Sequence, residues 1–469
     1  MFSLKKNEGF DNILRMIREQ NKEKVNHSSE IEKTLNSLKL TMKNWKTDIG
    51  MYSIIKYDKQ AFGLTQEDYE TIGLLRSVVV DEEGNIVAYS PPKCLHITEQ
   101  REKSFNGSNI MTQATEGTDK ATSETNQWRA EEFVEGTMIN LFYSKTQTGE
   151  GWEIATKSTV GGNVVFYSPK NPKDTIEFRD KDTFRNMFFE TCSNIGFKYE
   201  DLPKEFMYSF VLQHPKNRIV LLHKEAKIYI IGIYSINSIN KDTLDVMQLT
   251  TAGFEETYGS GVVLRPKQLF ADSYTVEGFK KEYASMNSSY NMMGIVFYNM
   301  VTGERMKVRN PMYEMVKNIK GAEQKLQLQY LTLRHGGRVA DYLKAFPEYK
   351  ADFAVFRGQL HGFTRSLHQN YVDCFVLKKR PFSEFPQQYK KFMSGLHKKY
   401  LEELRENKGS VTFNYVVEFV NTQNPMFLLY SLNYVVREHK KTIERIDDTG
   451  GSLAPIEIVE TETMGGLET

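Results

Sequence analysis

The first 48 residues show the spacing of amphipathic helices. Apolar side chains recur there at intervals of three and four residues, which places them on one helix face. The positions are Phe10, Ile13, Leu14 and Ile17, followed after a polar break by Ile31, Leu35 and Leu38. We therefore expect residues 1–48 to form an N-terminal helical segment.

From about residue 50 the pattern changes to one that is typical of strands. The segments 77–80 (Ser-Val-Val-Val) and 86–89 (Ile-Val-Ala-Tyr) flank the polar turn 81–85, which predicts a hairpin. Further strands are expected at 133–143, 152–157, 208–213, 217–222, 227–234, 294–298 and 305–308, with a helix at 181–196. Residues 103–127 are rich in Ser, Thr, Asn, Gln and Gly, which indicates a mobile surface loop. The set predicts an α+β core of mainly antiparallel sheets over residues 49–318.

Beyond Pro311 the pattern is helical almost to the end. Leu396, Tyr400 and Leu404 share one helix face, and short apolar runs at 416–420 and 427–429 indicate further buried helices. We expect an all-helical domain over residues 319–446, which would offer contacts to a protein partner. Residues 447–469 are acidic and rich in Gly and Thr, so we expect a flexible tail.

Composition narrows the class of protein. A length of 469 residues suits two or three domains, and a hydrophobic content of 40% is enough for each to bury a core. No apolar run approaches the ~20 residues of a membrane span, and the polar first residues lead us to expect no secretory signal. Three scattered cysteines form neither a disulfide framework nor a metal pattern, and the nine histidines form no zinc motif. These features predict an intracellular, cytoplasmic protein with no membrane association and no metal site.

Net charge excludes one mode of nucleic-acid binding. Lys and Arg number 61 against 60 Asp and Glu. Because the charges balance, affinity for a nucleic acid must come from a local basic patch rather than from the whole chain.

Two segments carry a resemblance to a known family. Phe133-Val134-Glu135-Gly136 resembles the first motif of covalent nucleotidyltransferases, Lys-x-Asp/Glu-Gly, with phenylalanine in place of the nucleophile. The segment from Tyr208 to Val220 resembles the third motif of phage-type RNA ligase 1, Phe-Glu-Phe-Val-x-Pro-x-Asn-Arg-Ile-Val. A benzyl side chain cannot form a phosphoramidate, so the resemblance comes with a missing nucleophile.

Other segments follow in the order of the family's motifs. They are Arg76-Ser77 with Pro92-Lys93, Thr156-Lys157-Ser158, Gly294-Ile295-Val296 and Lys307-Val308-Arg309. The resemblance covers roughly residues 50–318, and the whole chain is also similar to ligase-related proteins of large DNA viruses. It implies a nucleotidyltransferase-like fold for residues 49–318 and, if the relatives are viral, a host cytoplasmic location.

The family's chemistry is altered at three positions. In the active enzymes the first-motif lysine is adenylylated, a third-motif glutamate holds the ribose and a fourth-motif glutamate helps to bind a divalent metal. Here these positions are Phe133, Val211 and Met293. The resemblance therefore implies a catalytically degenerate protein with no catalytic residue at these positions, for which Mg²⁺ matters only if activity survives.

Five basic residues match family positions that approach the nucleotide phosphates: Arg76, Lys93, Lys157, Lys307 and Arg309. If the fold is kept, they gather in one cleft beside a pocket formed by Phe133, Glu135, Gly136 and Met293. Phosphate is the natural ligand of such a cleft. The expected partner is a nucleotide or an RNA 5′ end.

Several alternatives remain open at this level. Phe133 could stack on a base while the cations hold a polyphosphate, which would make the protein a reader of the 5′ cap. Lys145 or Lys157 could act as a relocated nucleophile of an active ATP-dependent RNA ligase. Each cation could instead be a solvated surface charge, in which case the protein would have a structural or scaffold role.

Overall fold

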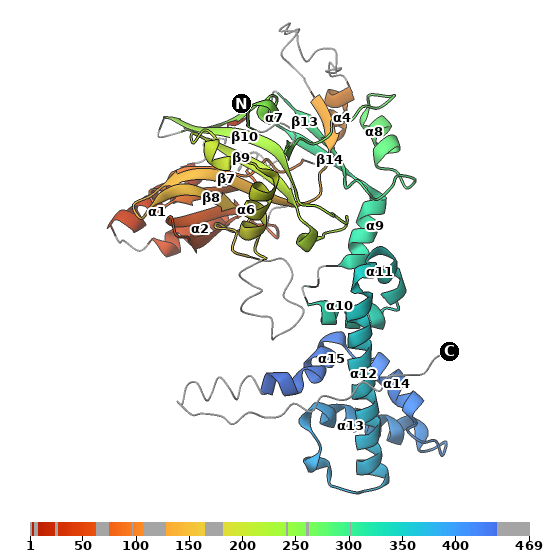
Figure 1. Cartoon of the computed structure of the whole chain (residues 1–469). Helices are drawn as coiled ribbons and strands as arrows, with labels where there is room; N and C mark the ends of the chain where they lie inside the picture. The colour runs from red at the N-terminus through yellow and green to blue at the C-terminus, as the bar shows by residue number, and fades with distance from the viewer. Residues whose placement is uncertain are drawn as a thin grey trace. The chain divides into compact units, whose positions relative to one another are not determined.

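The computed structural model describes residues 2–3, 8–23, 27–61, 75–95, 97–106, 128–164, 182–240, 243–258, 262–300, 302–321, 323 and 325–438. The chain divides into two compact units, Met1–Gln324 and Lys325–Thr469 (Figure 1). The predicted α+β class, with mainly antiparallel sheets, N-terminal helices and a helical C-terminal region, is confirmed.

A seven-stranded sheet forms the centre of the first unit. Its strand order is β1-β11-β10-β9-β7-β8, and β12 pairs in parallel with β10 while every other pair is antiparallel. The strands are β1 (Phe2–Ser3), β7 (Thr137–Lys145), β8 (Glu150–Ala155), β9 (Phe206–Gln213), β10 (Lys227–Asn240), β11 (Thr243–Leu249) and β12 (Val263–Leu264). The predicted strands at 208–213 and 227–234 correspond to β9 and β10, its long central pair.

Helix α6 (Phe184–Ile195) covers one face of this sheet (Figure 1). Thr183 caps its first turn by accepting a hydrogen bond from the N–H of Asn186 at 3.2 Å. Phe188, fully buried, packs with Phe210 of β9 in a cluster that also holds the short helix α7 (Phe254–Tyr258). Aromatic packing thus fixes the face of β9 that points away from the candidate site.

A four-stranded sheet carries the N-terminal helices. Its order is β2 (Leu40–Lys46), β3 (Met51–Tyr57), β4 (Ser77–Asp81) and β5 (Ile86–Tyr89), all antiparallel. Pairing of β4 with β5 confirms the predicted hairpin. Helices α1 (Glu8–Glu23) and α2 (Ser28–Ser37) share a core with this sheet. Residues 1–48 are therefore helical only in part, because Leu40–Lys46 pairs with β3 through a tight turn.

The third sheet has the order β14 (Arg305–Arg309), β13 (Gly294–Asn299) and β6 (Trp128–Glu132). Helices α4 (Glu99–Asn106) and α8 (Val276–Tyr283) pack on it. The expectation of a loop from residue 103 is wrong at its start, since Phe105 on α4 is fully buried among the rings of Trp128, Phe279 and Phe297. Residues 107–127 lie outside the described part. Helix α9 (Pro311–Lys320) follows β14 and contains the expected boundary at 318.

Every element described in the second unit is helical. The elements are α10 (Leu326–His335), α11 (Val339–Ala345), α12 (Lys350–Tyr371), α13 (Gln387–Lys399), α14 (Phe413–Asn421) and α15 (Pro425–Leu432), and α12 and α13 each continue into a π-helical turn. The predicted helical runs at 396–405, 416–420 and 427–429 fall in this set. Residues 447–469 lie outside the described residues. No described helix has the length and apolar character that crossing a membrane requires.

Candidate functional site

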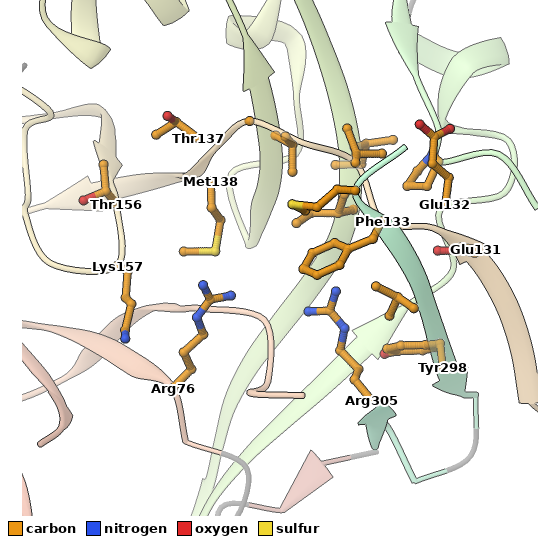
Figure 2. A pocket seen from close by; sticks show the side chains of 18 of the residues that line it. Arg76, Glu131, Glu132, Phe133, Thr137, Met138, Thr156, Lys157, Tyr298 and Arg305 are labelled. Atoms are coloured by element: carbon orange, nitrogen blue, oxygen red, sulfur yellow. The ribbon is translucent and has the colours of Figure 1, made fainter. Parts of the chain in front are cut away.

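A cavity of about 860 Å³ lies in the first unit (Figure 2). Strands of the seven-stranded and three-stranded sheets line it, together with Arg76 before β4 and the segment 156–159 after β8. Seven residues expected from the sequence line this cavity: Arg76, Phe133, Gly136, Lys157, Val211, Met293 and Arg309. Three others, Lys93, Glu135 and Lys307, are not among the lining residues.

Three apolar residues, Phe133, Val211 and Met293, form an apolar part of the cavity wall. Phe133 follows β6, and its N–H donates to the carbonyl of Gly294 at 2.9 Å. Val211 on β9 lies opposite Met138 on β7. Met293 completes this wall just before β13. The side chains at these positions can contact a ligand only through apolar surface.

Phe133 also has a cationic neighbour. The guanidinium of Arg309 lies over its ring, 4.9 Å from the centroid, and also pairs with Glu314 at 2.9 Å. A cation over an aromatic face is attracted by the ring quadrupole. Position 133 thus lies beside positive charge, which β14 supplies.

Gly136 is required by the close approach of two strands. A Cβ at this position would lie 2.5 Å from both the carbonyl oxygen of Leu212 and the Cγ1 of Val211. Such distances are far below van der Waals contact, so any larger residue would push β9 away. The glycine of the motif therefore has a packing role that does not depend on catalysis.

Six basic side chains and two carboxylates line the cavity among the described residues. Arg129 pairs with Glu131 on the same strand, and Lys317 lies 3.9 Å from Glu314. Arg76, Lys157 and Arg305 have no carboxylate at ion-pair distance within the described residues. Figure 2 shows the Arg76 guanidinium directed toward Met138 and that of Arg305 toward the ring of Phe133. These cations face an apolar wall, which leaves their charge available to an anionic ligand.

Lys157 lies in a crowded cationic environment. Burial lowers its pKa to about 8, and Arg76, Lys59 and Lys56 contribute to this shift by repulsion. Its ammonium donates to the hydroxyl of Tyr57 at 3.0 Å and lies 4.4 Å from the centre of that ring. Lys93 lies 4.3 Å from the same centroid, so Lys93 and Lys157 both contact the Tyr57 ring.

Lys307 projects from the same strand as Arg305 and Arg309. Its side chain is exposed, yet partial desolvation lowers the pKa of its ammonium, and Arg309 and Arg76 lower it too. Alternate residues of a strand share a face. The expected pair Lys307 and Arg309 is therefore part of a row of three cations, and Arg305 is the member that sequence reasoning missed.

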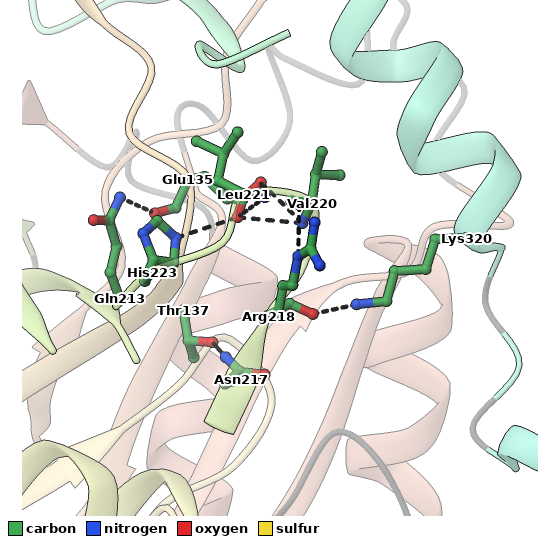
Figure 3. Close-up of polar contacts among 9 residues, drawn as sticks. All are labelled: Glu135, Thr137, Gln213, Asn217, Arg218, Val220, Leu221, His223 and Lys320. Carbon is green, nitrogen blue, oxygen red and sulfur yellow. Dashed lines mark hydrogen bonds and ion pairs between the residues drawn. The ribbon is translucent and has the colours of Figure 1, made fainter. Parts of the chain in front are cut away.

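Glu135 performs a different task from Phe133 (Figure 3). Its carboxylate is almost fully buried and accepts hydrogen bonds from the N–H groups of Val220 and Leu221, the shortest at 3.0 Å. The Nε2 of His223 lies 3.4 Å away, and Gln213 donates to the Glu135 carbonyl at 2.8 Å. The expected place of Glu135 in the pocket is therefore not observed, because its side chain turns into this buried network.

This network also explains why one predicted strand, at residues 217–222, does not form. Residues 217–222 look like a strand because four consecutive residues, 219–222, are apolar. In the structure a short 3-10 turn at Pro215–Asn217 is followed by bends at residues 219–221. The prediction of a strand is therefore wrong. The amides of Val220 and Leu221 are used by the Glu135 carboxylate rather than by a neighbouring strand.

Asn310 is a second residue that sequence reasoning overlooked. It is fully buried, its N–H donates to the carbonyl of Met293 at 3.1 Å, and its side-chain amide donates to Met292 and Ser289. Its Oδ1 also caps α9. Asn310 thus fixes Met293 beside Arg309, and the Asn-Pro pair at the start of a helical pattern is the signal that could have revealed it.

The two carboxylates that line the cavity are those of Glu131 and Glu132. Throughout the described ranges no group of three or more His, Cys, Asp or Glu side chains could hold a metal ion. Met293 offers no oxygen ligand at the position where the family's metal-binding glutamate is expected. Glu131, the nearer carboxylate to Arg305, is already paired with Arg129.

Comparison with known proteins gives one significant relative in sequence. The RNA ligase of Rhodothermus phage RM378 is 32% identical over 111 residues, which is 23% of this chain and 23% of that protein. The chain thus matches about a quarter of the relative's length. No family model matches the chain. The similarity confirms the resemblance to RNA ligases that the motifs indicated.

Solved structures of two mutants of Naegleria gruberi RNA ligase, each with ATP and Mn, were also found. Sequence identity is 12% and 14%, and the TM-score is 0.24 for both. The first alignment covers 41% of this chain and 51% of the ligase, and the second covers 49% and 64%.

Proposed function

We propose that this chain is a catalytically degenerate relative of RNA ligases that binds the phosphates of an RNA 5′ end in the cavity of the first unit. One observation carries the proposal: the cations Arg76, Arg305 and Lys157 line the same cavity as the apolar residues Phe133, Val211 and Met293. Charge that would hold phosphates is present, whereas the nucleophile and the two glutamates of the family are replaced.

Physical chemistry favours a phosphate over other anions. Arginine presents planar donors that match a phosphate in a bidentate way, and such charge-assisted hydrogen bonds contribute about 1.5–3 kcal/mol each. Three cations without carboxylate partners in the described structure suit a ligand with several negative charges. A 5′-triphosphate supplies these charges in one compact group, and the ring of Phe133 adds a surface for a base.

The test compares RNA strands of one sequence that end in a 5′-triphosphate, a 5′-monophosphate, a cap or a 5′-hydroxyl. Fluorescence anisotropy with a 3′ dye should give the tightest binding for the triphosphate and the weakest for the hydroxyl. Arg76→Met should weaken triphosphate binding by about 10- to 100-fold, since one charge-assisted contact is lost.

Arg15→Met is the matched control, because Arg15 is 64% exposed on α1 and does not line the cavity. It should leave the affinity unchanged. Equal binding of all four 5′ ends, or no effect of Arg76→Met, would overturn the proposal in favour of a scaffold role. Tightest binding of the capped strand would select the cap-reading version.

A second candidate function is covalent nucleotidyl transfer through Lys157. It is favoured by the position of this amine on the cavity wall and by its pKa of about 8. The deprotonated amine would attack the α-phosphorus of a nucleotide, forming a P–N bond as pyrophosphate leaves, and its second proton would pass to water. Lys145 is a poorer candidate, because it is 80% exposed, pairs with Glu150 at 3.7 Å and lies outside the cavity lining.

Incubation with α-labelled ATP or GTP and Mg²⁺ or Mn²⁺ separates the two functions. A label that survives denaturing electrophoresis and disappears in Lys157→Arg would establish the covalent function. The degenerate function predicts no label in either protein.

A further inference from the structure

A row of lysines leads away from the cavity along the four-stranded sheet. Ser158 lines the cavity, and its Oγ accepts a hydrogen bond from the ammonium of Lys56 at 3.0 Å. Lys56 belongs to β3, and Lys59 follows in the turn at the end of that strand. The positive charge of Lys157 is thus continued outside the cavity wall.

The register of β2 and β3 extends this row. Lys56 lies directly opposite Thr41, and Lys43 is two residues further along β2, so Lys43 and Lys56 share one face of the sheet. Lys43 is exposed, and its ammonium lies 4.3 Å from the centre of the Trp45 ring. We name Lys43, Lys56 and Lys59 the lysine row.

These cations repel one another. The pKa of Lys56 is lowered by burial and then by Lys59 and Lys43, and Lys56 and Lys59 in turn lower that of Lys157. No carboxylate lies at ion-pair distance from any member of the row within the structure as described. An anion with regularly spaced charges would relieve the repulsion along the whole row.

The size of the cavity limits what it can hold. Pockets of about 300–1,000 Å³ enclose a single small ligand, so a cavity of about 860 Å³ has room for a terminal nucleotide but not for a strand. A longer ligand must leave the cavity, and the lysine row begins where Ser158 forms its wall. Trp45 lies at the far end, half-buried, with one ring face beneath Lys43.

We infer that the lysine row is the path of a single-stranded RNA whose 5′ end occupies the cavity, so that the ligand is a polynucleotide rather than a free nucleotide. This inference rests on the proposed function of the cavity. Backbone phosphates lie along Lys56, Lys59 and Lys43, and a base can stack near Trp45, as in other proteins that bind single strands by charge and aromatic contacts.

The test uses ligands of different length. Wild-type protein and the Lys43→Gln/Lys59→Gln variant are titrated with GTP and with a ten-nucleotide RNA that carries a 5′-triphosphate. Both lysines are exposed, so the fold should be retained. Affinity for the ten-nucleotide RNA should fall about five- to tenfold, while that for GTP stays unchanged. The salt slope for the RNA should become shallower by about 1.4, since each phosphate contact on a single strand contributes about 0.7.

Two controls isolate the effect. Lys145→Gln/Lys280→Gln removes the same charge from two exposed lysines elsewhere, 80% and 52% exposed, and should leave both affinities unchanged. Arg76→Met should weaken both ligands, because Arg76 lines the cavity.

The outcomes distinguish the two proposals. If Arg76→Met weakens both ligands but the double variant does not affect the RNA, the path is wrong and the cavity function stands. If Arg76→Met affects neither ligand, the proposed function fails. The double variant is also titrated with a poly-glutamate peptide and with anionic vesicles. If it loses as much affinity for either of these as for the RNA, the RNA path is overturned in favour of a non-specific anionic partner.

Discussion

Phe133 and Glu135 lie two residues apart in one motif, yet their surroundings differ completely. Phe133 faces the cavity, with the Arg309 guanidinium over its ring. Glu135 is 2% exposed, and its carboxylate binds two backbone amides of the segment after β9. One residue belongs to the wall of a site and the other to the framework that supports it.

The difference shows which part of a motif is held in place by packing. Removing a buried acceptor leaves its donors without partners, which costs free energy whether or not the protein is an enzyme. A side chain on a cavity wall has no such constraint, because water or ligand can contact whatever replaces it. Glu135 and Gly136 are therefore required by packing, whatever side chain occupies position 133.

The largest expected effect is on stability. Glu135→Ala should lower the free energy of unfolding of the first unit by about 3 kcal/mol, since the N–H groups of Val220 and Leu221 lose their acceptor. Urea unfolding followed by tryptophan fluorescence measures this unit, because all three tryptophans lie within it.

Glu150→Ala is the control, since Glu150 is 56% exposed and its ion pair with Lys145 contributes less than about 1 kcal/mol. If both variants are equally stable, Glu135 has no supporting role and the contrast between the two positions disappears.

A smaller effect is expected from pH. In the free protein the pKa of Lys157 is lowered to about 8, first by burial and then by Arg76 and two lysines. A bound phosphate favours the charged ammonium, so binding above pH 8 requires uptake of a proton. Affinity for a 5′-triphosphate RNA should therefore fall with rising pH above about 8, by at most about tenfold per pH unit.

Lys157→Arg provides the comparison, because arginine stays protonated throughout this range. Its affinity should be nearly constant between about pH 7 and 9.5. The same decline in wild type and variant would mean that Lys157 does not meet the phosphates.

The smallest effect is expected when a lysine is placed at position 133. On the proposed degenerate function, Phe133→Lys should not form a labelled protein with α-labelled ATP and Mg²⁺, because Val211 and Met293 offer no carboxylate to a ribose or to a metal ion. A stable label in this single variant would show that the cavity retains catalytic support, and the distinction between wall and framework would need revision.

Much of the fold follows from local patterns in the sequence. The hairpin of β4 and β5, the pair β9 and β10, and the helix α6 all combine a clear period with a recognisable boundary. Three segments did not follow their pattern. Leu40–Lys46 is a polar edge strand whose pairing is set by β3, Phe105 turns the start of an apparent loop into a buried helix, and residues 217–222 give their amides to Glu135.

The candidate site was predicted less completely. Motif order indicated Arg76, Lys157 and Arg309, which line one cavity. Arg305 was missed although it alternates with Lys307 and Arg309, and Asn310 was missed because its role lies in three buried hydrogen bonds to residues 17–21 positions earlier.

The sequence by itself determined the class of the fold and the apolar character of Phe133, Val211 and Met293, because side-chain identity and period are local properties. The tertiary structure alone decided that Arg76, Lys157 and Arg305 face a common cavity and that Glu135 does not. These groups come from different sheets, and only the packing of those sheets sets the distances between their charges and the water that surrounds them.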